Sequence, residues 1–530
     1  MSNSLNELTQ AVKNGSLSRR EFMQRAGALG IAMPLASTLF SQSAHAATPV
    51  KGGHLVLAMA GGATTDRLDP ASALAQTAFA QLRAWGNTLV QTDPIDGSAK
   101  PMLAESYEAE PGAKVWHFKL RQGVSFHNGQ EMTSDDVVKT LQRHSGEDTK
   151  SAALGIMRGI ESIEAEGKYG VKVTLKSGNA DLPYLMTDYH LVIQPGGGYD
   201  NPDAGIGTGP YKIEVNEPGV RFVAKKFADH FDESVGHVDS VEIRVLNDQT
   251  ARSAALRSGQ AHMANLLDPK TAKLMARLPT INIENTSGRG HYLFPMHADK
   301  APFDNNDLRL AMKYAINREE MVEKILHGYG SVGNDLPINK AYALFSDDIE
   351  QRKYDPEKAA HHFKKSGHSG PVELIVSDVA FPGAVDAALL YQQQAKKAGI
   401  DLQVKRAPAD GYWSNVWNKK PFCASYTGGR ATQDLHYSVF YKSTADWNDT
   451  KWVRPKFDEL LTSAQAELDQ AKRKAIYREM GVMMRDDGGA IIPMFNDYID
   501  GVSSKIGGYV RDPGGELSNG YALTRCWINA

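Results

Sequence analysis

The side chains best suited to binding a small solute gather late in the chain, between residues 412 and 452. Ten of these residues are aromatic, whereas aromatic residues make up 8% of the whole sequence. They alternate with small and polar residues, above all in the stretch GGRATQD at residues 428–434. Pockets for organic ligands combine apolar walls with a few placed polar groups, so this mixture favours a binding site. An aromatic-rich core is the alternative. Trp413 and Tyr426 are the aromatic candidates for ligand contact.

Other motifs that carry chemistry are absent or stand in the wrong context. Residues 328–333 match G-x-G-x-x-G, but they follow a predicted helix, whereas the dinucleotide fingerprint follows a strand. We read them as a helix end and a loop. His361, His362 and His368 lie on a lysine-rich stretch that is typical of an exposed helix face rather than a metal site. The pair at 135–136 stands at a helix start, where capping explains carboxylates. The sequence therefore predicts no enzyme, no cofactor and no metal.

The elements that must position a site follow an α/β pattern. A strand at 373–376, a helix at 384–398 and a strand at 401–404 succeed one another, and Gly399 ends the helix. Alternating or periodic apolar residues predict further strands at 54–60, 171–175, 241–245 and 490–495, a strand–turn–strand at 116–126, and helices at 135–144, 308–316, 317–327 and 454–485, the last with room for a break.

The first 46 residues have the form of an export signal. A polar, basic start precedes the apolar run AGALGIAMPLASTLF, and Ala44–Ala46 supplies an A-x-A cleavage site. The apolar run is shorter than the ~20 residues of a spanning helix. Within the signal, the sequence SRREFM at 18–23 resembles a twin-arginine export motif. An ordinary signal with adjacent arginines is the alternative, and both predict an exported, periplasmic protein that starts near Ala47.

Composition limits the remaining classes of function. The chain has 530 residues, of which 42% are hydrophobic, and its formal net charge is −3. This length predicts two or three lobes, and the balanced charge gives no footprint for nucleic acid. The two cysteines, Cys423 and Cys526, allow at most one disulfide bond, and a pair of buried free thiols is nearly as well supported.

Several stretches together resemble one protein family. In chain order they are LDP at 68–70, PMLAES at 101–106, VWHFKLRQGVSFHNGQEMTSDDVVKTLQRH at 115–144, GTGPY at 207–211, and FDNNDLRLA with INREE at 303–320. These segments are similar, in the same order, to the large extracytoplasmic solute-binding proteins of ABC importers, the peptide, opine and nickel type. The resemblance extends over essentially all of residues 50–500.

The resemblance implies a two-lobed, type II periplasmic binding protein of the large three-domain variant. Lobe I would comprise residues 47–290 plus 496–530, with an extra subdomain at 91–206, and lobe II residues 291–495. Strands near 292–297 and 492–496 would join the lobes as a hinge. A ligand that binds the closed form more tightly shifts the hinge equilibrium, and the membrane permease then recognises the closed shape. A Cys423–Cys526 bond would tie the lobes together, which favours free thiols or a bond close to the hinge.

The ligand is the least determined part of this prediction. Peptide-binding members carry a G-W-x-[AG]-D loop whose aspartate holds the ligand ammonium. An ungapped alignment places Thr432 at that aspartate, while Asp434 lies two residues further on. Dipeptide binders also place an arginine before a helix, and residues 379–383 contain none. Arg430 is an additional cation in the loop, which we expect to hold a ligand carboxylate.

These differences argue against a site in which an aspartate and an arginine hold the two termini of a peptide. They predict a ligand with a carboxylate and several hydrogen-bonding groups. Thr432, Asp434 and Asn496 are the candidates for its polar groups, and Thr64 and Thr65 are the candidates from the facing lobe. Plain turn chemistry is the alternative for the two threonines. The expected function is capture of a peptide or an amino-acid conjugate for an inner-membrane permease, by a monomer. An opine or sugar–amine binder is the first alternative, and a hydrolase or a chaperone is a weaker one.

Overall fold

The computed structural model describes residues 49–73, 76–95, 97–146, 149–151, 153–377, 380–408, 412–445 and 447–529, together with Phe22, Arg25, Ala26 and Leu29. The predicted export signal at 1–46 lies outside the described residues apart from those four. In the part of the chain that is described, no helix is both long and apolar enough to cross a membrane.

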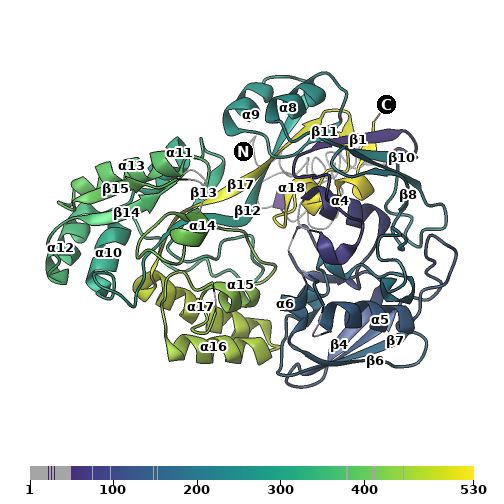
Figure 1. Cartoon of the computed structure of the whole chain (residues 1–530), viewed down its shortest axis with the longest axis horizontal. Helices are drawn as coiled ribbons and strands as arrows, with labels where there is room; N and C mark the ends of the chain where they lie inside the picture. Colours follow the sequence, from purple (N-terminus) through teal and green to yellow (C-terminus); the bar gives the residue numbers. More distant parts are fainter. Residues whose placement is uncertain are drawn as a thin grey trace.

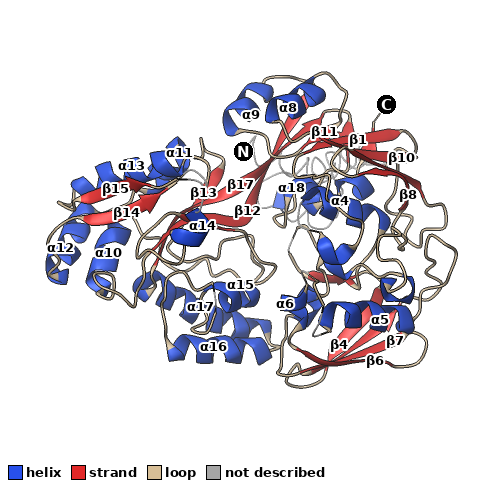
Figure 2. Cartoon of the chain, in the orientation of Figure 1, coloured by secondary structure: helices blue, strands red, loops and turns tan. Residues whose placement is uncertain are grey.

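The first lobe is built on one end of a mixed sheet that counts nine strands among the described residues (Figures 1 and 2). Strand β1 (His54–Met59) lies between β10 (Ser240–Val245) and β11 (Met263–Ala264) and runs parallel to both. Its residues beyond His54 are all buried because both faces are covered. One face packs on α4 (Gln76–Trp85) and the other on α8 and α9. The other elements of this end are β8 (Tyr211–Glu217), β9 (Arg221–Lys226), α8 (Gln249–Arg257) and α9 (Pro269–Met275).

A smaller antiparallel sheet forms a subdomain of this lobe, below the main sheet in Figure 1. Helix α5 covers the sheet, and the capping box between Thr133 and Asp136 that begins this helix confirms the sequence prediction. The sheet and helix enclose a hydrophobic core of their own. The elements are β4 (Ala104–Ala109), β5 (Val115–Leu120), α5 (Ser134–Ser145), β6 (Ile160–Ala165) and β7 (Gly170–Leu175), with β2 (Val90–Thr92) and β3 (Ala99–Pro101) alongside.

Two long antiparallel strands join the lobes. Strands β12 (Ile281–Pro295) and β17 (Ala490–Ser503) pair along most of their length and cross the centre of the molecule (Figure 1). Their pairing shifts register between Ser287 and His291, where Gly288 and Gly290 flank Arg289. An irregular pairing at the crossing point is a natural place for a hinge, because fewer ladder bonds resist bending there.

The second lobe has its own α/β core. Strands β14 (Val372–Val376) and β15 (Leu402–Arg406) are parallel and flank α13 (Ala384–Lys396), which confirms the predicted strand–helix–strand unit. The apolar face predicted at 308–316 is buried in this core. The other elements of the lobe are α10 (Asn306–Tyr314), α11 (Arg318–Lys324), β13 (Gly330–Val332), α12 (Pro356–Ser366), α14 (Tyr412–Asn415), β16 (Ser425–Thr427), α15 (Gln433–Phe440), α16 (Pro455–Ala466) and α17 (Gln470–Asp487).

Short elements complete the chain. The C-terminal segment returns to the first lobe as β18 (Ile506–Gly507), α18 (Glu516–Asn519), α19 (Ala522–Arg525) and β19 (Trp527–Ile528). Helices α6 (Leu154–Met157) and α7 (Leu182–Leu185) and the 3-10 helices η1 (Pro70–Ser72), η2 (Tyr189–Leu191) and η3 (Pro195–Gly198) lie in the first lobe.

Some predicted elements differ from the structure. The predicted strand at 124–126 is wrong, since Phe126 N–H and Met132 N–H bond back within a tight turn over 124–132. The predicted helix over 317–327 ends at Lys324, and His327 has a left-handed φ of 52°. The predicted loop at 328–333 contains strand β13, which pairs with β17. The break allowed for in the helix predicted over 454–485 is present, because this segment forms α16 and α17. Cys423 and Cys526 are buried free thiols, which confirms the preferred reading.

Candidate functional site

A groove of about 800 Å³ lies where both lobes meet β17. The first lobe contributes Gln249 and residues 266–270, which follow the carboxyl ends of β10 and β11. The second lobe contributes residues 324–327 and part of 382–393 at the start of α13. The carboxyl ends of parallel strands are a usual place for ligands in α/β folds, and the volume suits a small organic molecule.

Among the ligand-binding residues predicted from the sequence, Asn496 lines this groove, next to Tyr498. Both side chains pack on the glycines of the hinge. A Cβ added to Gly290 would lie 3.1 Å from the Asn496 amide oxygen, and one added to Gly288 would lie 2.9 Å from the Tyr498 ring. The inner wall of the groove therefore rests on the irregular part of β12 that carries Arg289.

Thr64 and Thr65 are exposed in the turn that follows β1. Asn247 fixes this turn, because it accepts from Gly61 N–H at 2.9 Å and donates to the Gly62 carbonyl at 2.9 Å. The two threonines are not among the described residues that line the groove. Their role in ligand binding stays a prediction.

The aromatic cluster at 412–452 serves the protein core to a large extent. Its buried members are Tyr412, Phe422, Tyr437, Phe440, Tyr441 and Trp452. Tyr426 is 53% exposed on β16, opposite Tyr292 in the strand register. Trp413 belongs to α14, and its side chain lies outside what the structure describes. The sequence left an aromatic-rich core as the alternative to a binding site, and packing in the core explains most of these aromatic residues.

The loop at 428–434 leads from β16 into α15. Thr432 is the N-cap of the helix and accepts from Leu435 N–H at 3.2 Å. Arg430 donates to the carbonyls of Gly428 and Gly429 at 3.1 and 3.2 Å, and its guanidinium lies 5.0 Å from the Phe440 ring centre. Asp434 points elsewhere, into the contact between the lobes. Arg430 and Asp434 therefore do not converge on one ligand group.

The two lobes touch through a buried ion pair, which we call the interlobe clasp. Asp181 precedes α7 in the first lobe, and Arg473 lies on α17 in the second lobe. Their side chains are 3% and 2% exposed. Arg473 also donates to the Ala464 carbonyl at 2.9 Å and to the Tyr477 hydroxyl at 3.0 Å. Nearby, Ala180 N–H donates across the interface to the Gln465 carbonyl at 2.7 Å.

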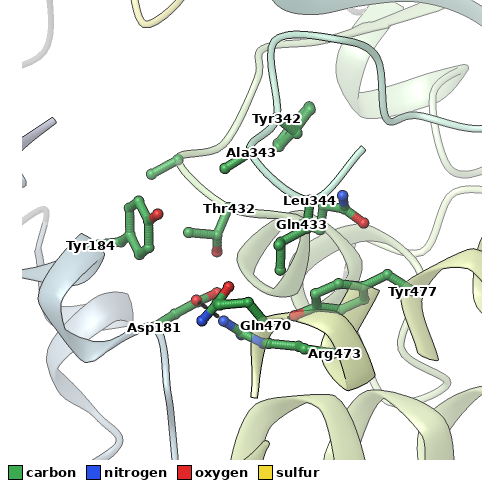
Figure 3. A pocket seen from close by; sticks show the side chains of 11 residues that line it. Asp181, Tyr184, Tyr342, Ala343, Leu344, Thr432, Gln433, Gln470, Arg473 and Tyr477 are labelled. Carbon is green, nitrogen blue, oxygen red and sulfur yellow. Dashed lines mark hydrogen bonds and ion pairs between the residues drawn. The ribbon is translucent and has the colours of Figure 1, made fainter. Parts of the chain in front are cut away.

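Figure 3 shows this contact, with Asp181 and Tyr184 facing Arg473, Gln470 and Tyr477 across a narrow pocket. The pocket has a volume of about 20 Å³. A cavity of that size accommodates about one water molecule and no organic solute. The pocket at the clasp is therefore too small for an organic solute, and the larger groove at the hinge is the candidate ligand site.

Asp434 is a second acid in the clasp. Burial, and next the Asp181 carboxylate, raise the pKa of Asp434 to about 7, while Arg473 opposes the shift. One arginine thus faces two buried aspartates, of which Asp181 holds the ion pair. The charge of Asp434 at the contact between the lobes therefore depends on pH.

We expect Asp434→Asn to change how stability depends on pH. The folded pKa is higher than the ordinary value of 3.8, so the folded state binds the proton more tightly, and stability falls as pH rises from about 4 to about 7. An asparagine side chain at this position has no proton to lose, so the variant should be more stable than the parent at pH 8, by about 2–4 kcal/mol, and similar at pH 4. Urea denaturation at both pH values measures this, with exposed Glu459→Gln as the control. Equal pH profiles for parent and variant would contradict the role of Asp434.

The sequence analysis did not find the clasp. Asp181 and Arg473 are 292 positions apart, and no local pattern in the sequence links them. Arg289 was also missed, since one arginine between two glycines has no distinctive spacing. The three residues become recognisable only when the lobes are placed together.

Comparison with known proteins identifies the family to which this fold belongs. The model for bacterial extracellular solute-binding proteins, family 5 (middle), matches residues 98–450. The chain is 24% identical over 431 residues to the glutathione-binding protein GsiB of Pectobacterium atrosepticum, covering 78% of this chain and 83% of that protein. It is 24% identical to the dipeptide-binding protein of Escherichia coli over 78% and 84% of the two chains. The structure of HbpA2 from Haemophilus parasuis superposes with a TM-score of 0.81 at 20% identity, over 90% of this chain and 100% of that one.

The chain belongs to family 5 of the bacterial extracellular solute-binding proteins. The type II, two-lobed α/β fold predicted from the sequence is confirmed. The protein is the solute-binding component of an ABC importer, as its sequence indicated. Its matched relatives are binding proteins rather than enzymes.

Proposed function

We propose that this protein captures a peptide or a peptide-like amino-acid conjugate in the periplasm and delivers it to an inner-membrane ABC permease. One observation carries the proposal: two lobes joined by β12 and β17 also touch through the buried Asp181–Arg473 pair. Two bodies on a two-strand hinge with a separable contact form a clamshell, which a solute closes by binding the closed form more tightly. The named ligands of the relatives, glutathione and dipeptides, support this solute class.

The remaining parts of the proposal follow from the sequence. Residues 1–46 serve as a twin-arginine export signal. Lobe I comprises 47–290 and 496–530 with a subdomain at 91–206, and lobe II comprises 291–495. Arg430 and Asn496 are the proposed ligand contacts among the predicted residues, because Arg430 carries the charge and Asn496 lines the groove. The protein acts as a monomer and leaves every bond of the solute intact.

A thermal-shift screen over dipeptides, tripeptides, opines and sugar–amine conjugates tests the proposal. Because a ligand that binds only the folded state stabilises it by mass action, a solute present at 100 times its Kd adds about 2.7 kcal/mol. We expect the same solute to reduce the radius of gyration in X-ray scattering and to be recovered unchanged by mass spectrometry. Scattering curves that stay identical with and without the best solute, or recovery of a cleaved product, would contradict the proposal.

A further inference from the structure

Five buried or partly buried arginines have no acidic partner among the described residues, namely Arg83, Arg252, Arg289, Arg430 and Arg525. Arg252 donates to four backbone carbonyls, and Arg525 lies over the Tyr521 ring. Arg83, Arg289 and Arg430 are the three that act on the hydroxyls of Tyr189 and Tyr342. Arg83 and Arg289 are 6% and 7% exposed, and Arg430 is partly buried. Within the described part of the chain, none of the three lies at ion-pair distance from a carboxylate. Other buried arginines of the chain do have such a partner, namely Arg309, Arg318, Arg352 and Arg473. Arg83, Arg289 and Arg430 therefore lack the carboxylate partner that these four arginines have.

Each of these arginines uses few of its donors. A guanidinium carries five N–H groups. Arg83 donates to the Thr187 carbonyl at 3.0 Å, and its Nε has no partner among the described residues. Arg289 donates through Nε to the Ala341 carbonyl at 3.1 Å. A buried cation with unused donors is unfavourable by itself, and an anion placed between the lobes would remove that penalty.

Arg289 and Arg430 lie next to each other. A Cβ on Gly429 would overlap the Cβ of Arg289, so the loop that carries Arg430 rests directly on the hinge strand. Both residues also contact Tyr342. The Arg289 guanidinium is 5.4 Å from the ring centre, and Arg430 N–H approaches the hydroxyl at 3.4 Å. Glycine at 429 is thus required for this close approach of the loop to the hinge strand.

Arg83 brings a third positive charge from the facing lobe. Phe79, one turn earlier on α4, stacks on Tyr189 at a centroid distance of 3.7 Å. Burial and then Asp188 raise the pKa of Tyr189, whereas Arg83 and Arg430 both lower it. Arg83 and Arg430 therefore act on the same hydroxyl group from opposite lobes.

Two acids lie near this group without pairing to it. Asp512 accepts from Gly514 N–H at 2.8 Å, and burial raises the pKa of Asp512 and of Glu516. Arg289 and Arg83 are among the charges that lower the pKa of Asp512. Arg525 adds a fourth guanidinium beside Asp512, and Asp188 adds a third carboxylate beside Tyr189, so the guanidinium groups still outnumber the carboxylates.

We propose that the region where Arg289 and Arg430 meet, next to the groove that Asn496 lines, is specific for a net-anionic solute with two carboxylates, one held by Arg430 and the other by Arg289. Arg83 adds attraction from the facing lobe, and Asp512 remains to accept an ammonium group of the solute. The inference rests on the proposed function, because it requires a solute enclosed between the lobes. It narrows the solute class to acidic peptides and their conjugates.

Matched pairs of solutes test this specificity by calorimetry. Ala-Glu and Ala-Gln differ only in one carboxylate, as do glutathione and its glycine ethyl ester. We expect the diacid to bind at least about 10-fold more tightly than its partner in at least one pair. Arg289→Gln should weaken the diacid about 30-fold and remove the discrimination, while Arg289→Lys should retain part of it. Arg406→Gln, an exposed change on β15, is the control and should bind as the parent does. Melting of each ligand-free variant reports whether it folds.

The outcomes separate this inference from the proposed function. Equal affinity within both pairs, or undiminished discrimination in folded Arg289→Gln, would overturn the inference and leave the proposed function standing. Binding of Ala-Ala-Ala with none of the four probes bound would do the same. If neither these probes nor any solute of the wider screen binds, both the inference and the proposed function fail.

Discussion

Arg473→Gln should open the molecule in the absence of solute. The substitution leaves Asp181 without its cation in a site where both side chains are almost fully buried. An uncompensated buried charge costs about 3–5 kcal/mol. Because the lobes are joined by a two-strand hinge, their separation exposes Asp181 to water and avoids most of that cost. We therefore expect loss of the closed form rather than unfolding, seen as a larger radius of gyration by X-ray scattering.

The same variant should bind its solute about 100-fold more weakly, because the solute must now supply the free energy that the clasp supplied. The double variant Asp181→Leu with Arg473→Met replaces the pair by apolar side chains and should regain much of the closure, since buried pairs are often replaceable in this way. Arg478→Gln, an exposed change on the same helix, is the control. A scattering profile and an affinity like those of the parent would show that the clasp does not hold the lobes together.

Local patterns were sufficient to predict much of the fold. The Thr133–Asp136 capping box and the apolar face of α10 depend on residues within one or two turns of each other. The parallel pairing of β14 and β15 follows from a strand–helix–strand series in a short segment. The family resemblance then supplied the two-lobed arrangement, which no local pattern determines. The prediction of a strand at 124–126 was wrong because alternating buried side chains occur equally in a tight turn.

The site was less predictable because its contacts join distant segments. Asp434 lies two residues beyond the position that the family's aspartate takes, and α15 turns it toward Arg473, which follows it by 39 positions. Arg289 acquires its environment from Gly429 and Tyr342, both in the other lobe. The charge of Arg430 was apparent in the sequence. The positions of Arg289 and Arg83 near Arg430 were not apparent, because they depend on how the two lobes are placed together.

Asp335→Asn should be the most destabilising of the substitutions considered, and its effect should fall on the second lobe. Asp335 is fully buried and lies 2.6 Å from Arg318 Nη2 and 3.0 Å from Arg352 Nε. It also accepts from Ile492 N–H at 3.1 Å, which ties it to β17. Two guanidinium groups, each 1% exposed, thus share one buried carboxylate, and Arg352 has a second partner in the half-exposed Asp486 at 2.9 Å. Nearby, burial lowers the pKa of Lys313 to about 7, against the opposing effect of Asp335.

The asparagine variant isolates the charge from the backbone. Asp335 has a φ of 57°, a left-handed conformation that asparagine also tolerates. Loss of the carboxylate leaves Arg318 without an acidic partner and Arg352 with Asp486 alone, and an uncompensated buried cation costs about 3–5 kcal/mol. That is a large part of the 5–15 kcal/mol, roughly, that stabilises an ordinary domain. Unlike the clasp, this network lies inside one lobe, so no opening of the hinge can bring water to it.

Hydrogen exchange followed by mass spectrometry measures the effect by region. We expect faster exchange in α10, α11 and β14 of the variant, while β1, β10 and α5 keep the protection of the parent because they belong to separate cores. Asp347→Asn, an exposed change in the same connecting segment, should exchange as the parent does. Unchanged protection in the second lobe of Asp335→Asn would mean that the backbone carbonyl contacts of the two arginines and the Arg352–Asp486 pair suffice to stabilise them.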